Sequence, residues 1–276
     1  MRIDRRGLIL GAAAGLAAVP VFGQEDGLPL RGRFVQGGGA VGRTWPRALI
    51  FVDGEALTAA SDDGWFVVGF DYESAGSVQI EARSGDRSVS RTVGIARGDF
   101  PVSSINGLPA STVDVPDDPV LQALIAEQVA VKTEAFSSRI DADHFRDGFV
   151  WPLEAFRVTS RWGARRILNG TPARPHFGID LAAPQGTVVR APAAGRVTLA
   201  QADMHFEGGL VLLDHGQGLI TAYLHQSRLD VAAGQTVARG DPLGRVGMTG
   251  RATGPHLCWR MKWRDRNMDP SLFVGI

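Results

Sequence analysis

Near its C-terminal end the chain reads Gly254-Pro-His-Leu-Cys-Trp-Arg-Met-Lys-Trp263. Apolar and polar residues alternate along this stretch, as in a β-strand with one buried face. The odd-numbered side chains from Leu257 to Trp263 are therefore predicted to face the core. The opposite face would carry His256 and Cys258, about 6.6 Å apart along the strand at roughly 3.3 Å per residue. An imidazole and a thiol at this spacing can reach one metal ion or its bound water.

A second pair of metal-binding residue types occurs upstream, in His176-Phe-Gly-Ile-Asp180. In an extended strand the two side chains would lie about 13 Å apart, too far to bind one zinc ion at about 2 Å. We therefore expect this segment to bend, and Gly178 permits the bend. A third segment, Tyr223-Leu-His225, is predicted to place its tyrosine and histidine on one face of a strand.

Cys258 is the only cysteine in the 276-residue chain. A single cysteine cannot form a disulfide within the chain, and an exposed free thiol is prone to oxidation. We therefore expect Cys258 to be buried, bound to a metal, or paired with another chain.

The rest of the sequence predicts a mainly β protein. Residues 27–98 contain short alternating runs separated by glycine-containing turns, which predicts a small β-sandwich of the immunoglobulin type. Residues 117–143 are predicted to form a helical connector, because Asp117-Asp118-Pro119 can cap a helix and apolar residues follow at helical spacing. Residues 150–276 return to strands and turns and are expected to form an antiparallel sheet.

The N-terminus has the pattern of a signal peptide over residues 1–23. Arginines precede a modest apolar run, and the pair Arg5-Arg6 resembles a twin-arginine export signal. A membrane anchor is the alternative, although the run is shorter than the roughly 20 residues of a spanning helix. We expect an exported chain without stable membrane insertion after cleavage. The formal net charge of +0 gives no reason to expect a nucleic-acid partner.

From about residue 150 to 273 the sequence resembles the M23 family of zinc metallopeptidases, the lysostaphin and LytM group. That family has a His-x-x-x-Asp, a later Tyr-x-His, and a terminal His-x-His preceded by Gly-Pro or Thr. The resemblance implies an antiparallel β-sheet peptidase domain that binds Zn²⁺. It assigns His176, Asp180 and Cys258 to the metal ligands. His225 and His256 match the two histidines that activate water and stabilise the transition state.

The resemblance also implies the reaction, which is metal-assisted hydrolysis of peptide cross-links in bacterial peptidoglycan, in the periplasm or cell envelope. The sequence departs from the family at Cys258, where a second histidine is usual. A thiolate binds zinc at about 2.3 Å but gives the ion more negative charge than an imidazole does. We therefore expect the metal to be retained and turnover to be altered.

Two other functions remain open. The chain could be a LytM-like regulatory protein that binds and controls other cell-wall hydrolases, or a thiol hydrolase that uses Cys258 with His256. The latter leaves His176 and Asp180 without a role. The N-terminal domain is a candidate binding surface for a protein partner in the cell envelope. Arg260 and Lys262 continue along the face of His256 and are expected either to meet substrate carboxylates or to form a solvated edge.

Overall fold

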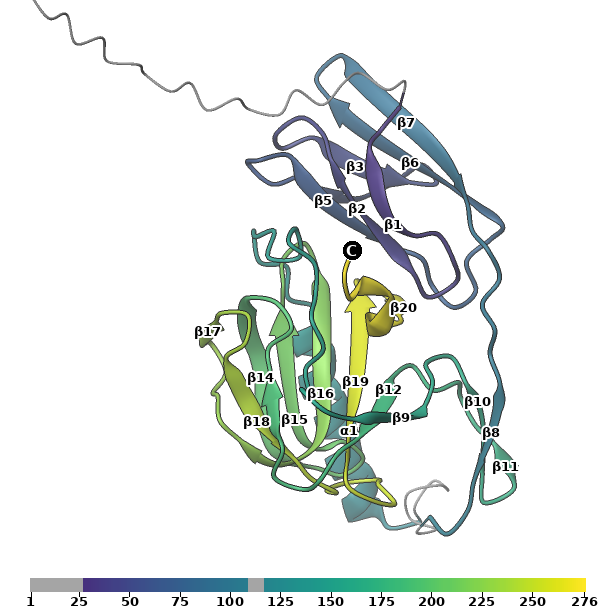
Figure 1. The fold of residues 1–276 in the computed structure, drawn as a ribbon, viewed down its shortest axis with the longest axis vertical. Helices are drawn as coiled ribbons and strands as arrows, with labels where there is room; N and C mark the ends of the chain where they lie inside the picture. Colours follow the sequence, from purple (N-terminus) through teal and green to yellow (C-terminus); the bar gives the residue numbers. More distant parts are fainter. Residues whose placement is uncertain (1–26, 109–116) are drawn as a thin grey trace, which may run out of the picture.

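The computed structural model describes residues 27–108 and 117–276, so the predicted signal peptide lies outside the described residues. The chain begins with two small sheets (Figure 1). The first has the order β1-β2-β5, formed by β1 (Leu30–Arg33), β2 (Gly39–Arg43) and β5 (Trp65–Gly69). The second has the order β4-β3-β6-β7, formed by β3 (Leu49–Val52), β4 (Glu55–Ala59), β6 (Ser77–Ser84) and β7 (Arg87–Gly94).

The turn between β3 and β4 shows why these short strands form. Asp53 and Gly54 have φ angles of 50° and 84°, and a two-residue hairpin turn of this kind requires left-handed backbone at both positions. Asp53 also accepts a hydrogen bond from the Gln79 amide through its carboxylate, at 2.8 Å. The turn is thereby attached to β6, the neighbouring strand of the same sheet.

The chain then runs to the far end of the molecule along β8 (Val102–Ile105) (Figure 1). This strand pairs in parallel with β10 (Arg165–Leu168), which forms a hairpin with β11 (Thr171–Pro172). The hairpin turn is Asn169-Gly170, again with positive φ at both residues. Two segments about sixty residues apart are thus held in one small sheet.

The single α-helix among the described residues, α1, spans Pro119–Phe136. Its N-cap is Asp118, whose carboxylate accepts a hydrogen bond from the Val120 amide at 2.9 Å. The predicted connector extended to residue 143, but α1 ends seven residues earlier. The helix packs against β14 of the large C-terminal sheet. No described helix is long and apolar enough to cross a membrane.

The C-terminal part is built on a ten-stranded sheet with the central order β17-β14-β15-β16-β19-β12-β9. Every pairing in it is antiparallel. Its members are β9 (Arg157–Ser160), β12 (Ile179–Ala182), β13 (Val188–Arg190), β14 (Gly195–Met204), β15 (Gly208–Asp214), β16 (Leu219–Leu229), β17 (Thr236–Val237), β18 (Pro242–Val246), β19 (His256–Trp263) and β20 (Arg266–Met268). A 3-10 turn, η2 (Pro270–Phe273), follows. The predicted mainly β fold is confirmed.

The central strands separate the molecule's buried residues into two clusters. The odd-numbered residues of β19, from Leu257 to Trp263, join a core that also contains buried residues of the N-terminal sheets. The even face of the sheet carries Cys258 and the smaller cluster, which includes Ala135 of α1. The prediction that the odd face of β19 is the core is correct.

Candidate metal centre

The candidate centre is assembled where β12 and β19 lie side by side. Asp180 and Cys258 are direct partners in this antiparallel ladder. His176 lies just before β12, and its Nε2 is 3.2 Å from Asp180 Oδ1, so the segment bends as predicted. Gly178 is required by space. A Cβ there would lie 2.7 Å from Cys258 Sγ and 3.1 Å from His176 Nε2.

The three side chains have a geometry suited to a metal ion. One ligand atom from each of His176, Asp180 and Cys258 lies within 4.8 Å of the others. His176 Nε2 is 3.3 Å from Cys258 Sγ. Two ligands at about 2.0 and 2.3 Å from one tetrahedral zinc lie roughly 3.5 Å apart, close to this distance. Asp180 Oδ1 is buried and has no hydrogen-bond partner among the described residues. These donors therefore fit zinc.

Burial and charge tune the ionisation of these groups. Burial lowers the pKa of His176 to about 4, so the ring is neutral and can donate its lone pair to a cation. Burial acts to raise the pKa of Asp180, but His176, His256 and Arg166 outweigh it and hold the pKa below its usual range. Burial and the charge of Asp180 raise the pKa of the Cys258 thiol to about 12. The thiol therefore keeps its proton until a cation displaces it.

A hydroxyl group on the side away from the candidate metal position orients the ring of His176. Its Nδ1 lies 3.0 Å from the hydroxyl of Ser160, on β9. A partner of this kind holds the ring of a ligating histidine so that the other nitrogen faces the metal. Ser160 was not singled out from the sequence, because no motif spacing connects it to His176.

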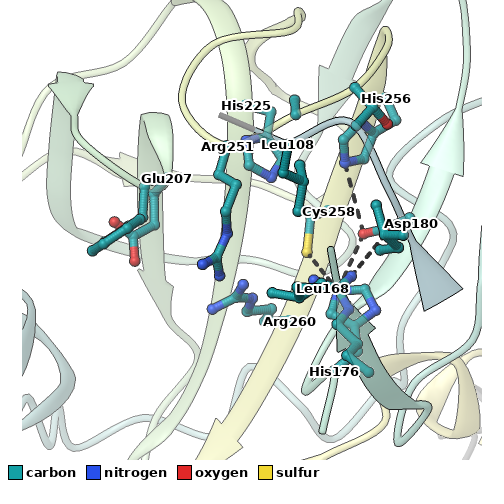
Figure 2. Close-up of a pocket in the computed structure, with 15 residues that line it drawn as sticks. Leu108, Leu168, His176, Asp180, Glu207, His225, Arg251, His256, Cys258 and Arg260 are labelled. Carbon is teal, nitrogen blue, oxygen red and sulfur yellow. Dashed lines mark hydrogen bonds and ion pairs between the residues drawn. The ribbon is translucent and has the colours of Figure 1, made fainter. Parts of the chain in front are cut away.

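His225 and His256 lie next to the candidate ligands, with ring centroids 4.7 Å apart (Figure 2). Nδ1 of His225 donates to the Thr249 carbonyl at 2.8 Å, and Nδ1 of His256 donates to the Gly254 carbonyl at 2.8 Å. In both rings Nδ1 is thus occupied, and Nε2 is left for the site. His256 Nε2 is 3.8 Å from Asp180 Oδ1. Burial, assisted by the charge of His256, lowers the pKa of His225 to about 3.

Tyr223 does not share the face of His225, and that expectation was wrong. Tyr223 is fully buried in the main core, where its hydroxyl meets Thr221 Oγ1 at 2.7 Å. The pairing of β15 with β16 has a bulge between Gly209 and Val211, and His225 within it has a left-handed backbone with φ of 66°. A bulge changes the direction of a side chain, so His225 leaves the alternation and reaches the candidate centre.

Two arginines place positive charge beside the candidate ligands. Arg166 of β10 forms an ion pair with Asp180 Oδ2 at 3.2 Å, although no sequence spacing indicated it. Arg260 lines the same pocket, and its positive charge acts to lower the pKa of Cys258 against the larger effect of burial. Lys262 lies on the same face of the sheet as expected, over the ring of Phe136 at 5.3 Å, but of the two only Arg260 lines the pocket.

The pocket over these residues has a volume of about 200 Å³. Part of its wall comes from the segment that follows the N-terminal sheets, through Ile105 and Leu108. Asn169 holds this segment in place with two hydrogen bonds to the backbone of Leu108, at 3.2 and 2.9 Å. Access to the candidate centre therefore depends on a part of the chain outside the large sheet.

Comparisons with known proteins agree with this geometry. The model of peptidase family M23 matches residues 174–270, a range that contains all five candidate residues. Peptidoglycan DD-endopeptidase ShyA of Vibrio cholerae is 37% identical over 118 residues, which are 42% of this chain and 27% of that protein. DD-carboxypeptidase/endopeptidase Mpg of Neisseria meningitidis is 39% identical over 126 residues, 45% of this chain and 29% of that protein.

A third relative, cell division protein DipM of Caulobacter vibrioides, is 35% identical over 132 residues, 46% of this chain and 21% of that protein. The chain thus spans less than a third of each of these relatives. A crystal structure of a candidate M23 peptidase from Pseudomonas aeruginosa matches more completely. It is 30% identical with a TM-score of 0.67, and the match covers 88% of this chain and 96% of that one. A relative matched over almost its whole length shows that the chain belongs to peptidase family M23.

Proposed function

We propose that this chain is a zinc-dependent endopeptidase that hydrolyses peptide cross-links of bacterial peptidoglycan. The observation that carries the proposal is the cluster of His176 Nε2, Asp180 Oδ1 and Cys258 Sγ, whose carboxylate oxygen is buried without a hydrogen-bond partner in the described part of the chain. A buried carboxylate oxygen in this position is satisfied when a cation binds.

In the proposed reaction the three ligands hold the ion, which supplies a polarised scissile carbonyl and a water of lowered pKa. Backbone carbonyls hold Nδ1 of His225 and of His256, which leaves both Nε2 atoms for the substrate, and that of His256 is 3.8 Å from Asp180 Oδ1. One ring takes the proton of the attacking water at Nε2, and the other, protonated at Nε2 as well as at Nδ1, donates a hydrogen bond to the oxygen that becomes negative. Their carbonyl partners, Thr249 and Gly254, occupy the Nδ1 atoms and leave the Nε2 atoms for the substrate.

The substrate follows from the relatives. ShyA is named a peptidoglycan DD-endopeptidase and Mpg a DD-carboxypeptidase/endopeptidase, and we propose peptidoglycan as the substrate class for this chain too. Peptidoglycan lies outside the cytoplasmic membrane, so the proposal includes export to the periplasm or cell envelope. The arginine-rich start of the chain has the pattern of an export signal.

A regulatory role without catalysis is the second candidate. Cys258, at the position the family pattern gives to a histidine, favours it, because a thiolate ligand weakens the Lewis acidity of zinc. Such a protein would bind other cell-wall hydrolases and use the pocket as a docking site.

One experiment separates the candidates. Bound zinc and the cleavage of cross-linked muropeptides are measured for the wild type, Cys258→Ser and Cys258→His. We expect about one zinc per wild-type chain together with cleavage, and loss of both in Cys258→Ser. Cys258→His should keep zinc and cleave faster, because a neutral ligand leaves the ion a stronger Lewis acid.

His144→Gln is the matched control, because His144 is a histidine outside the pocket. It should leave zinc content and cleavage unchanged. Zinc without cleavage in the wild type, with cleavage restored in Cys258→His, would identify the regulatory protein. Metal-independent cleavage that disappears in Cys258→Ser would contradict the zinc mechanism and favour the thiol hydrolase.

A further inference from the structure

The helix α1 is bound to the connection between β14 and β15. This connection consists of residues 205–207, and we call it the β14–β15 turn. The side chain of Gln128 accepts a hydrogen bond from the His205 amide at 2.8 Å and donates one to the Asp203 carbonyl at 3.1 Å. Four positions later in the helix, Lys132 Nζ lies 2.5 Å from Glu207 Oε1. Residues four apart lie on the same face of a helix, so one face of α1 holds both ends of the turn.

The ion pair between Lys132 and Glu207 is shielded from solvent. The side chain of Lys132 is 17% exposed and that of Glu207 is 12% exposed. The loss of one partner disturbs a shielded ion pair far more than an ion pair at the surface. Glu207 also lines the pocket of the candidate centre, where it attracts the positive charges of Arg251 and Arg260 (Figure 2). The carboxylate is therefore held between Lys132 on the helix and the two arginines of the pocket.

The backbone and the ring of His225 both depend on the β14–β15 turn. The His225 amide donates a hydrogen bond to the Glu207 carbonyl at 2.8 Å. The His225 ring donates to the Thr249 carbonyl, and Thr249 Oγ1 accepts a hydrogen bond from the Gly209 amide, just after the turn, at 2.9 Å. His225 has φ of 66°, and a non-glycine residue keeps such a conformation only where surrounding contacts fix it. The turn that α1 holds supplies these contacts.

We propose that Gln128 and Lys132 are positioning residues that hold the ring of His225 at the candidate centre through the β14–β15 turn. The inference rests on the proposed peptidase function, in which His225 transfers a proton or stabilises the oxyanion. Neither Gln128 nor Lys132 is among the described residues that line the pocket. Their loss should therefore act on turnover through His225, and lower kcat while KM stays unchanged.

Kinetics of four variants test the first consequence. Lys132→Met removes the charge and keeps the length of the side chain, and Gln128→Leu removes both hydrogen bonds to the turn. Each should lower kcat on cross-linked muropeptides about ten- to hundredfold, the usual effect of a small displacement of a reacting group. Lys132→Arg should keep most of the activity, because a guanidinium can form the same ion pair. Glu127→Gln is the control, because Glu127 is an exposed charged residue of the same helix.

Zinc content and Tm are measured for each variant. Zinc should stay near one equivalent, because neither positioning residue is among the three candidate ligands. Unchanged kcat in both Lys132→Met and Gln128→Leu would overturn the proposal while leaving the peptidase function intact.

A double-mutant cycle with His225→Asn distinguishes positioning from general destabilisation. If Lys132 acts through His225, Lys132→Met should cause little further loss of kcat once His225→Asn is present, because the ring that it positions is missing. A loss by the same factor in both backgrounds would show that Lys132 acts independently of His225, and would overturn the proposal.

Amide hydrogen exchange tests the positioning without relying on cleavage. In Lys132→Met the His225 amide should exchange about tenfold faster or more than in the wild type, because its acceptor lies in the turn. The amide of Leu213, a buried residue of β15 in the same sheet, should keep its wild-type rate. Unchanged exchange at His225, or equal acceleration at His225 and Leu213, would contradict the proposal. If the zinc-loaded wild type cleaves no muropeptide, the peptidase function fails, and these exchange rates alone decide whether α1 positions His225.

Discussion

His225 reaches the candidate centre through a single unusual backbone conformation. A non-glycine residue with φ of 66° is uncommon in a strand, and such conformations gather at functional sites because the surrounding structure holds them. Here the His225 amide donates to the Glu207 carbonyl at 2.8 Å and the ring donates to the Thr249 carbonyl. The position of the imidazole is therefore determined by contacts that do not involve a metal.

This geometry predicts the effect of replacing the ring. His225→Asn should lower kcat on muropeptides by about 10²- to 10⁴-fold, the usual contribution of a general acid or base. Zinc content should stay near one equivalent, because His225 is not among the three candidate ligands. Kinetics and metal analysis on the same preparation check both parts. A loss of zinc in His225→Asn would contradict the separation between ligands and proton-transfer residues.

His215 has a different role and gives a prediction about stability. It is fully buried, with Nδ1 2.6 Å from the Ala194 carbonyl and Nε2 2.8 Å from Thr221 Oγ1. Burial lowers its pKa to about 4. As the pH falls below about 6.5, the unfolded chain takes up a proton that folded His215 does not, so stability is lost between about pH 6.5 and 4.

The expected loss is on the order of 3 kcal/mol for this one group. Denaturant unfolding of the zinc-free chain between pH 7.5 and 4.5 measures it. His215→Gln should show a shallower decline with pH, because the variant has no group to protonate at this position. His176 and His225 contribute equally to both proteins, so parallel curves would show that His215 does not cause the pH dependence.

At the scale of the element, β19 is where sequence and structure agree best. Its alternation from Leu257 to Trp263 determines which side chains are buried, and the pairing of Cys258 with Asp180 follows from an ordinary ladder. The sequence could not reveal the bulge at His225, because no glycine or turn motif marks it. It also could not reveal Arg166, whose approach to Asp180 depends on how β10 and β12 are placed in three dimensions.

The pairing of β8 with β10 could not be predicted from the sequence either. Its stability can be tested through Asn169. The side chain of Asn169 binds both the amide and the carbonyl of Leu108. Asn169→Ala removes both hydrogen bonds and places alanine at φ of 47°, which asparagine tolerates better. The free energy of local opening should therefore fall by about 1 to 3 kcal/mol, and the amide hydrogens of residues 102–108 should exchange faster.

Asn106→Ala is the control within the same segment, because Asn106 is exposed. Its exchange should resemble that of the wild type. Unchanged protection in Asn169→Ala would mean that the β8–β10 ladder alone holds the wall of the pocket.

At the scale of the whole molecule, the N-terminal sheets and the large sheet share one core. Gln217, next to the start of β16, donates to the Trp65 carbonyl of β5 at 2.9 Å. The Asn267 amide donates to Asp71 at 2.8 Å, and the Asp269 amide donates to the Gly37 carbonyl at 2.7 Å. The shared core and these hydrogen bonds between the two parts favour unfolding of the whole chain in a single cooperative transition.

Gly39 lies at this junction, and a substitution there tests whether the N-terminal sheets and the large sheet unfold together. A Cβ at Gly39 would lie 2.6 Å from the Val68 carbonyl and 2.6 Å from Phe273 Cζ. Gly39→Ala should destabilise the fold by about 1 to 3 kcal/mol and lower Tm by several degrees, while one transition remains. Gly94→Ala is the control, because no atom lies within 4 Å of its Cβ position. Two calorimetric transitions, of which Gly39→Ala shifts only one, would show that the parts unfold separately.

The pairing of Asp180 with Cys258 has a consequence for how the centre is filled. Backbone hydrogen bonds between β12 and β19 keep the carboxylate and the thiol together whether or not a cation is bound. Chelation should therefore leave the strands intact, and reloading should require displacement of the thiol proton but no refolding. Occupancy of the proposed site is therefore expected to follow the local supply of metal and the rate of exchange, without a change in the fold.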